Sequence, residues 1–302
     1  SLGIILNIND ASSDVILHGG TFRKICYNGG GDRANAEILT LLAENRIFMK
    51  TYGELVDGSK TLLKDGFATT VGVIRHEDHG YDSTTGKCKI CGKRCGHTDV
   101  DSKTGVCSTC KYQLTAGISG VGTAKYFDNI DNAFTAALSA ENNGCTLTLY
   151  KDCELSQNIV IGNATLTVDV NGHSISPEIR GIDVNDGGVL YLKNSGENGS
   201  IGLEMAVNKG GTLINGTADD SSSAVSLFAV TADAAECVEF YGGSCTYLTI
   251  KNGTSGIALY GGYYDIICGS LTDNTPVNDL LAKGYAFATL NSVTHLPESI
   301  VD

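Results

Sequence analysis

Residues 181–194 read GIDVNDGGVLYLKN, and a similar segment returns three times toward the C-terminus. The three copies are MAVNKGGTLING at 205–216, ECVEFYGGSC at 236–245 and SGIALYGGYY at 255–264. Their anchor residues are Val189, Thr212, Val238 and Ile257, which are separated by 23, 26 and 19 residues. A strand that repeats at this interval, with turn residues between the copies, is typical of a parallel β-helix, in which each coil stacks on the previous one.

The same pattern begins earlier, at CTLTLYKDCEL (145–155) and IVIGNATLTVDVNGHSI (159–175). Because strand side chains alternate between two faces, one set of apolar residues should point into the stack: Leu147, Leu149, Leu166, Val168 and Val170. The end coils have unpaired strand edges that must be covered. We expect a helix over 127–140 to cover the first coil and LLAKGYAF (280–287) to cover the last. The sequence thus predicts an all-β fold, a parallel β-helix with short capping helices over residues 113–302.

The first seventy residues resemble the end of such a module. The segment VILHGGTF (15–22) matches IALYGGYY (257–264), and Cys26 matches Cys268. An internal repeat of this kind indicates an array of similar modules. We therefore expect residues 1–70 to form the C-terminal rungs and cap of a preceding β-helix module in a tandem parent chain, with a short helix over 36–48.

Residues 76–110 carry a second repeat, HEDHGYDSTTGKCKICGKRCGHTDVDSKTGVCSTC, which holds five of the eleven cysteines. DSTTGKC-x-x-C at 82–91 returns as DSKTGVC-x-x-C at 101–110. With the donors that precede each copy, this makes two sets of four: His76, His79, Cys88 and Cys91, and then Cys95, His97, Cys107 and Cys110. Tetrahedral Zn²⁺ prefers such sets. The sequence therefore predicts a zinc-ribbon-like spacer over 71–112 that holds one or two structural ions.

Disulfide pairing in a secreted protein, or free thiols in a disordered linker, is the alternative for this spacer. Histidines recur together with the cysteines in both halves of the spacer. This pattern favours a metal site, because histidine takes no part in a disulfide. A polar segment without an apolar run would also gain roughly 10 kcal/mol of folding free energy from each bound ion. Four protein ligands leave no open position for water, so we expect structural and not catalytic sites.

The net charge narrows the range of partners. The 302 residues include 34 Asp and Glu against 21 Lys and Arg, a formal net charge of −13. Such a field repels phosphate backbones, so we do not expect nucleic acid as a partner. Because no apolar run approaches the length that spans a bilayer, we also expect no transmembrane segment.

Aromatic side chains are expected on the outside of the last coils. By alternation, Tyr241 and Tyr260 face outward and stack on adjacent coils, with Tyr263, Tyr264 and Tyr285 nearby. Exposed tyrosines can stack on sugar rings or anchor a protein partner. The first four of these tyrosines are therefore candidate ligand-binding residues. The alternative is an aromatic ladder that only shields the coil.

No catalytic residue is assigned. β-Helix lyases need clustered carboxylates for Ca²⁺ and a basic residue that removes a proton. The nearest set here is Arg180, Asp183, Asp186 and Lys193. Charged residues occur at the corners of any β-helix, so this set favours an enzyme only weakly.

The order of motifs along the chain resembles a known group. It runs from C-x-H and C-x-x-C through YFDNIDNAFTAAL, TLTLYKDCEL and LTVDVNGHSI to VNDLLAKGYAF. This order is similar to the right-handed, pectate-lyase-like β-helix modules of large surface proteins from Gram-positive gut bacteria. The first Cys/His set departs from that pattern, with His76-x-x-His79 where the group has Cys-x-His.

The resemblance implies a bacterial extracellular or cell-wall-associated repeat protein. We expect a non-catalytic scaffold for adhesion that binds a glycan or a host surface protein. The alternatives are a polysaccharide lyase or hydrolase that uses the β-helix groove, and a passive structural spacer.

Overall fold

The chain divides into two compact units, which are described separately. One unit comprises residues 1–99 and 107–112, and the other comprises residues 100–106 and 113–302. The computed structural model describes residues 4–8, 15–27, 41, 43, 46–50, 63–64, 67–75, 80–89, 94–177, 181–251, 254, 256–269, 277–290 and 297–301.

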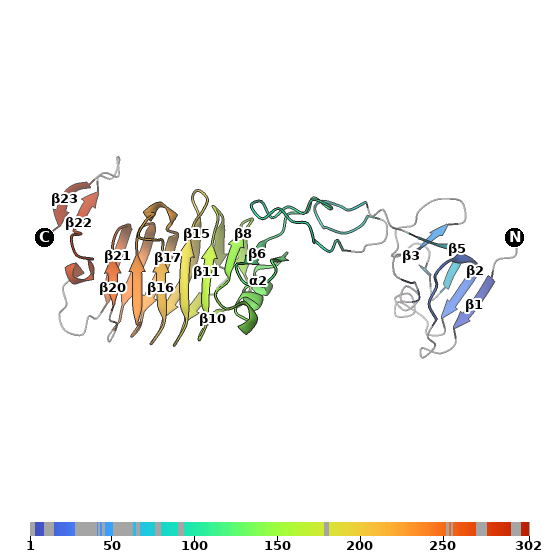
Figure 1. Ribbon diagram of the computed structural model, residues 1–302, viewed down its shortest axis with the longest axis horizontal. Coiled ribbons are helices and arrows are strands. Elements are labelled where there is room, and N and C mark those ends of the chain that lie inside the picture. The colour runs from blue at the N-terminus through green and yellow to red at the C-terminus, as the bar shows by residue number, and fades with distance from the viewer. Residues whose placement is uncertain are drawn as a thin grey trace. The chain divides into compact units, whose positions relative to one another are not determined.

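Two eight-stranded sheets form the main body of the larger unit (Figure 1). The main path of sheet A contains six strands, in spatial order β10 (Ile159–Ile161), β13 (Gly181–Val184), β15 (Ser200–Val207), β17 (Ser226–Ala232), β19 (Ser244–Ile250) and β21 (Tyr263–Gly269). Two further strands complete the sheet: β12 (Ser174–Pro177) pairs with β15 and also with β9 (Cys153–Leu155). Sheet B contains β7 (Lys125–Phe127), β6 (Ala116–Ser119), β8 (Thr146–Leu149), β11 (Thr165–Asp169), β14 (Val189–Lys193), β16 (Thr212–Asn215), β18 (Cys237–Phe240) and β20 (Ile257–Leu259).

The chain visits the two sheets in turn, and from β8 onward neighbouring strands within each sheet are parallel. Each visit to both sheets completes one coil, and the unit is a β-solenoid of about five turns. The prediction of a parallel β-helix is therefore confirmed.

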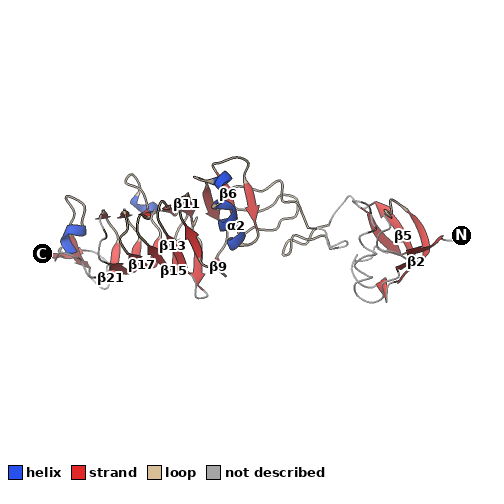
Figure 2. Cartoon of the chain, turned by 90° about the horizontal axis from the view of Figure 1, so that it is seen from below, coloured by secondary structure: helices blue, strands red, loops and turns tan. Residues whose placement is uncertain are grey.

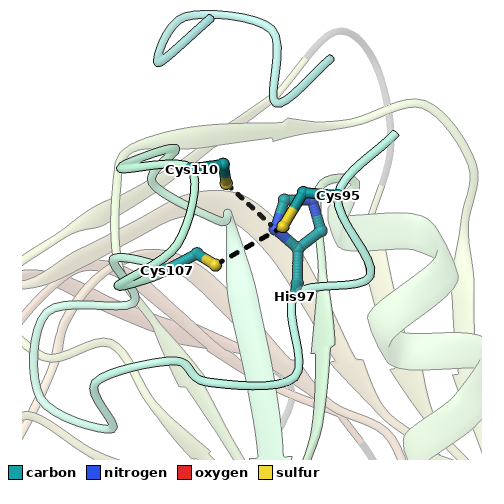
Figure 3. Close-up of side chains that lie close together, drawn as sticks. All are labelled: Cys95, His97, Cys107 and Cys110. Carbon is teal, nitrogen blue, oxygen red and sulfur yellow. Dashed lines mark hydrogen bonds between the residues drawn. The ribbon is translucent and has the colours of Figure 1, made fainter. Parts of the chain in front are cut away.

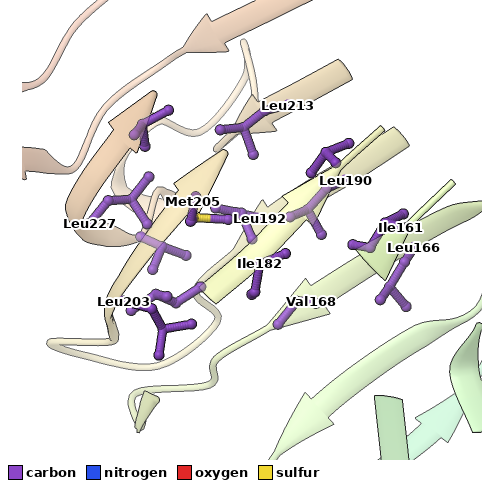
Figure 4. Close-up of a cluster of buried hydrophobic side chains, with 14 of the residues drawn as sticks. Ile161, Leu166, Val168, Ile182, Leu190, Leu192, Leu203, Met205, Leu213 and Leu227 are labelled. Carbon is purple, nitrogen blue, oxygen red and sulfur yellow. The ribbon is translucent and has the colours of Figure 1, made fainter. Parts of the chain in front are cut away.

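Alternation along each strand builds the core. In β14, Leu190 and Leu192 are buried, whereas Tyr191 between them is exposed. Strand register stacks the inward residues of successive coils, so Leu190 lies opposite Leu213, which in turn lies opposite Val238. Figure 4 shows part of the resulting apolar core. Each fully buried side chain of this size contributes about 1.5–3 kcal/mol, so the repeated column holds the coils together.

One predicted interval is wrong by one residue. Parallel pairing places Cys237, not Val238, opposite Thr212. The predicted anchors mixed the two faces, since Thr212 points outward and Val238 is fully buried. These two strands are joined by a long connection that contains the 3-10 turn η2 (Ser221–Ser223). Counting the residues between the anchors does not reveal the one-residue shift, because the count does not show how this connection folds.

A short helix covers the first coil, as predicted, but it is shorter than expected. α2 spans Ile130–Ala137 and buries Ile130 and Phe134 against the core. It lies at the end of the stack beside β6 (Figure 2). Phe127 ends strand β7 and is not part of the helix, because the Asn129 side chain caps the helix by accepting a hydrogen bond from the backbone N–H of Asn132 at 3.0 Å. The 3-10 turn η1 (Ala140–Asn142) follows.

The last coil is covered in part by the predicted segment 280–287. Leu280, at the end of the 3-10 turn η3 (Val277–Leu280), is buried, and Leu281 forms a parallel bridge with Leu259 of β20. After this segment, β22 (Phe287–Leu290) and β23 (Pro297–Val301) form an antiparallel hairpin.

The described residues of the smaller unit contain one five-stranded sheet. Its strands are β1 (Ile4–Ile8), β2 (Gly20–Tyr27), β3 (Arg46–Lys50), β4 (Leu63–Lys64) and β5 (Phe67–Arg75). β1 and β2 are parallel, whereas β5 runs antiparallel to β2, β3 and β4. The predicted boundary at residue 70 falls inside β5. The predicted helix over 36–48 is wrong at its C-terminal end, because Arg46–Phe48 pair with β5; most of its other residues lie outside the described part of the chain.

Candidate functional site

Four side chains of the smaller unit converge on one point (Figure 3). They are Cys95, His97, Cys107 and Cys110, whose ligand atoms all lie within 4.8 Å of one another. The Sγ atoms of Cys95 and Cys107 are 3.7 Å apart, and Cys110 Sγ lies 3.5 Å from His97 Nδ1. The three cysteines are buried and carry free thiols. The structure thus brings together the second predicted donor set.

These distances fit a tetrahedral metal ion. With metal–sulfur bonds of about 2.3 Å, tetrahedral geometry separates two sulfur ligands by about 3.8 Å. With a metal–nitrogen bond of about 2.0–2.1 Å, the sulfur-to-nitrogen separation becomes about 3.6 Å. A disulfide would instead need sulfurs about 2.05 Å apart. The four residues could therefore hold a metal ion.

Backbone turns hold the Cys107–Cys110 knuckle in shape. The N–H of Cys107 donates to the carbonyl of Tyr112, and the N–H of Lys111 donates to the carbonyl of Cys107. Burial raises the pKa of the Cys107 thiol, but the backbone N–H of Cys110 and the His97 side chain favour the thiolate more strongly and bring the pKa down to about 6. The knuckle therefore offers a thiolate, which is the form that binds metal.

The His97 ring is fixed by its neighbours. Its centroid lies 5.6 Å from that of Tyr112, and a Cβ added to Gly86 would lie only 3.2 Å from His97 Cε1. His97 Nε2 is buried and has no hydrogen-bond partner among the described residues. Because Nδ1 faces the thiols, ligation through Nδ1 would leave the proton on Nε2, against Gly86.

The sequence repeat in this spacer is also a repeat of local structure. Asp82 Oδ1 accepts hydrogen bonds from the N–H groups of Thr84 and Thr85, and Asp101 Oδ1 accepts them from Lys103 and Thr104. The Thr84 hydroxyl, which also donates to Asp82 Oδ1, lowers the pKa of Asp82 most, followed by the Thr84 N–H; the N–H and the hydroxyl of Thr104 lower the pKa of Asp101. A glycine in the left-handed region closes each turn, Gly86 at φ +65° and Gly105 at φ +67°.

The first predicted donor set is described at one position. Cys88 is buried, whereas His76, His79 and Cys91 lie outside the described residues. A first ion at His76, His79, Cys88 and Cys91 therefore stays a prediction.

A groove of about 1180 Å³ lies at the last coil of the larger unit. It is lined by the four predicted tyrosines and by further residues that include Tyr285, Ser221, Ser222, Asp265, Ile267 and Phe287. No sequence pattern predicted the loop around Ser221. The longest repeat interval, 26 residues, is the signal that would have pointed to an insertion there.

The tyrosines play different parts in the groove. Tyr241 and Tyr260 stack with centroids 4.4 Å apart, and Tyr285 meets Tyr260 at 5.9 Å with its ring nearly perpendicular. Tyr263 is 55% exposed. The Tyr264 ring packs edge-on against Phe240, and its hydroxyl donates to the carbonyl of Gly261. Tyr264 therefore contributes to the coil as well as to the groove.

The lyase-like charged residues lie on different surfaces. Asp183 belongs to β13 of sheet A and Lys193 to β14 of sheet B, where its Nζ lies 3.9 Å from Asp169. Asp186 is in the turn between those two strands, and Arg180 lies outside the described residues. The described members of this set do not form one cluster.

Comparison with protein-family models, curated proteins and solved structures finds no match to this chain. Among the described residues, none of the helices has the length and apolarity that crossing a membrane requires.

Proposed function

We propose that this chain is a non-catalytic scaffold whose tyrosine groove binds a neutral carbohydrate. The observation that carries the proposal is the Tyr241–Tyr260 stack in the wall of the groove. Tyrosine offers a large contact area that loses little conformational entropy on binding. Because the stack is already ordered by the coils, a sugar that docks beside it has no side chain to order there.

The surroundings of the stack suit a sugar. Tyr263 and Tyr285 are each about half exposed, which leaves aromatic surface for the apolar side of a sugar ring. The groove also presents the hydroxyls of Ser221 and Ser222 and the carboxylate of Asp265, which can bond to sugar hydroxyls. A net charge of −13 disfavours uronates and other polyanions, so we propose neutral oligosaccharides.

Titration calorimetry of the purified chain with a panel of neutral oligosaccharides tests this proposal. We expect at least one ligand to bind, and Tyr285→Ala to weaken that binding about tenfold, a loss of one stacking contact. Tyr191→Ala is the matched control, because Tyr191 is similarly exposed on β14 and does not line the groove. An absence of binding across the panel, or equal losses in the two variants, would overturn the proposal.

We also propose that the ion at Cys95, His97, Cys107 and Cys110 is Zn²⁺ in a structural role. Three thiols and one imidazole match the preferences of zinc, and four protein ligands close the coordination sphere. Metal analysis of the purified protein tests this. One zinc ion per chain is expected from the described cluster, and two if the first donor set also binds.

The sequence resemblance supports a proposal for the location of the protein. We propose that the protein is an extracellular or wall-associated array of right-handed, pectate-lyase-like modules. In this array, residues 1–70 form the end of one module, residues 71–112 form the spacer and residues 113–302 form the next module. The match between segments 15–22 and 257–264 supports the array. Surface labelling of the source cells with an antibody to the chain tests the location, and labelling confined to the cell interior would contradict it.

A further inference from the structure

The two units contain strand pairs with the same register. In the smaller unit, Ile8 of β1 lies opposite Tyr27 of β2; in the larger unit, Ile250 of β19 lies opposite Gly269 of β21. Residue 8 thus corresponds to residue 250, and residue 27 corresponds to residue 269. In both strands the corresponding residue lies 242 positions further along the chain. β1 and β2 of the smaller unit therefore correspond to β19 and β21.

The segments that follow correspond as well. Phe48 lies opposite Val73 in the β3–β5 pair, and Phe287 lies opposite Val301 in the β22–β23 pair. The next pairs along the strands, 49 with 72 and 288 with 300, keep the same correspondence. β3 and β5 therefore correspond to β22 and β23.

A backbone contact ahead of these strands supports the correspondence. In the smaller unit, the N–H of Ala43 donates to the carbonyl of Leu17. In the larger unit, the N–H of Ala282 donates to the carbonyl of Leu259. Leu17 and Leu259 are again 242 positions apart, and Ala43 and Ala282 are separated by 239 positions, as are Phe48 and Phe287. The same connection thus leads into β3 and into β22.

The two units differ in where the last strand lies. β5 lies between β2 and β3 and pairs with both. β23 pairs with β22, and the only strand among the described residues that pairs with β21 is β19. Within that part of the chain, one edge of β21 is thus open, and β21 carries exposed apolar side chains, Tyr263 and Ile266. An open edge of this kind accepts an added strand.

The groove occupies the corresponding position. Tyr263 and Ile267 of β21 line it, as do Phe287 and Ala288 of β22. In the smaller unit, the strands that correspond to β21 and β22 have β5 between them. The part of the groove between β21 and β22 therefore corresponds to the position of a strand.

We propose that the open edge of β21 binds β23 in antiparallel pairing, which gives the strand order β21–β23–β22 and closes the last coil. β23 is the chosen occupant because it already pairs with β22 in the register that β5 has with β3. Pro297, which has no N–H to donate, begins β23, a position that strands tolerate. Docking would fill only the part of the groove between β21 and β22, whereas the Tyr241–Tyr260 stack on which the carbohydrate proposal rests lies outside the strands, so the two proposals can fail independently.

The register of β5 on β2 fixes the register of β23 on β21. Thr21 lies opposite Gly72 in the smaller unit, so Tyr263 should lie opposite Ile300 after docking. Side chains that are directly opposite on antiparallel strands have Cβ atoms about 4.5–5.5 Å apart. The double variant Tyr263→Cys with Ile300→Cys would therefore bring two thiols within reach of each other. Tyr263→Cys with Ser299→Cys is the matched control, because successive strand residues point to opposite faces.

The experiment oxidises both double variants mildly and quantifies the links by peptide mass spectrometry, which separates them from links to the native cysteines. Docking predicts an intramolecular link between positions 263 and 300 in about tenfold higher yield than between positions 263 and 299, independent of protein concentration. Equal yields, no link, or a link formed only between chains would overturn the proposal. The last outcome would assign the edge to a second copy of the chain.

Hydrogen exchange of the wild-type chain gives a second readout that needs no substitution. In a free edge strand, the N–H groups of alternate residues point to solvent and exchange rapidly. Docking predicts that both alternate sets of β21 amides are protected. Rapid exchange of one set would contradict docking, whatever the result of the carbohydrate titration.

Discussion

The rings of Tyr241 and Tyr260 lie parallel, with an interplanar angle of 6° and centroids 4.4 Å apart. The stack follows from strand register, because Phe240 lies opposite Leu259 and each tyrosine is the next residue in its chain segment. The two rings thus belong to successive coils, and their contact is a consequence of the solenoid repeat.

This stack should stabilise the last coil. Aromatic pairs contribute about 0.5–1.5 kcal/mol beyond the area that they bury, so we expect Tyr260→Ala to lower the free energy of unfolding by about 1–2 kcal/mol. Tyr260→Phe retains the ring and should remain close to wild type. Urea unfolding followed by circular dichroism measures both. Equal stability of the two variants would show that the stack contributes nothing.

Gly105 should be intolerant of a side chain for two separate reasons. Its φ of +67° disfavours any L-residue, and an added Cβ would lie only 2.3 Å from Cγ of the buried Tyr150 ring. Gly122 has a similar φ of +63° but nothing within 4 Å of its added Cβ. We therefore expect Gly122→Ala to cost about 1 kcal/mol and Gly105→Ala to cost at least about 2 kcal/mol more. Thermal unfolding of the two variants measures how much more stability Gly105→Ala loses through the clash with Tyr150. Equal stabilities of the two variants would show that the clash has no cost.

The core could be predicted from sequence because one local rule determines it. Leu166, Val168 and Val170 alternate with polar residues, and all three are fully buried. The same rule placed Tyr241 and Tyr260 on adjacent coils. The cysteine and histidine spacing likewise found Cys95, His97, Cys107 and Cys110, since a repeated C-x-x-C turn presents its thiols in a fixed local geometry.

What the sequence did not predict depends on contacts distant in the chain. Arg46–Phe48 follow an apolar pattern that also fits a helix, and pairing with β5 makes them a strand. The shift that sets Cys237 opposite Thr212 depends on how the Ser221 loop folds back, which no interval count contains. The groove also needed that loop, which no sequence pattern placed beside the predicted tyrosines.

Asn215 should be the most sensitive polar residue of the solenoid. It is fully buried, its Nδ2 donates to the carbonyl of Val225, and its Oδ1 accepts from the N–H of Val225, both at 2.9 Å. Asn215→Ala would leave both backbone groups without partners, at about 1–3 kcal/mol each. Asn208→Ala is the control, since Asn208 is half-buried and donates to Asn185. We expect the first variant to lose about 2–5 kcal/mol and the second about 1 kcal/mol in urea unfolding. A loss at Asn215 no larger than that at Asn208 would contradict this account.

Removal of the metal should loosen the spacer and leave the solenoid intact. The apolar column through Leu190 and Leu213 does not include the cluster, whereas the cluster ties Cys95 to the Cys107–Cys110 knuckle. We therefore expect Cys107→Ser to lose one equivalent of zinc and to speed amide exchange about tenfold or more at residues 94–99 and 107–112, with no change in β14 and β16. Cys145→Ala, which removes a buried thiol outside the cluster, should keep the zinc. If both variants retained the wild-type metal content and exchange pattern, the four residues would not be ligands, and the 3.7 Å between Cys95 and Cys107 would reflect packing alone.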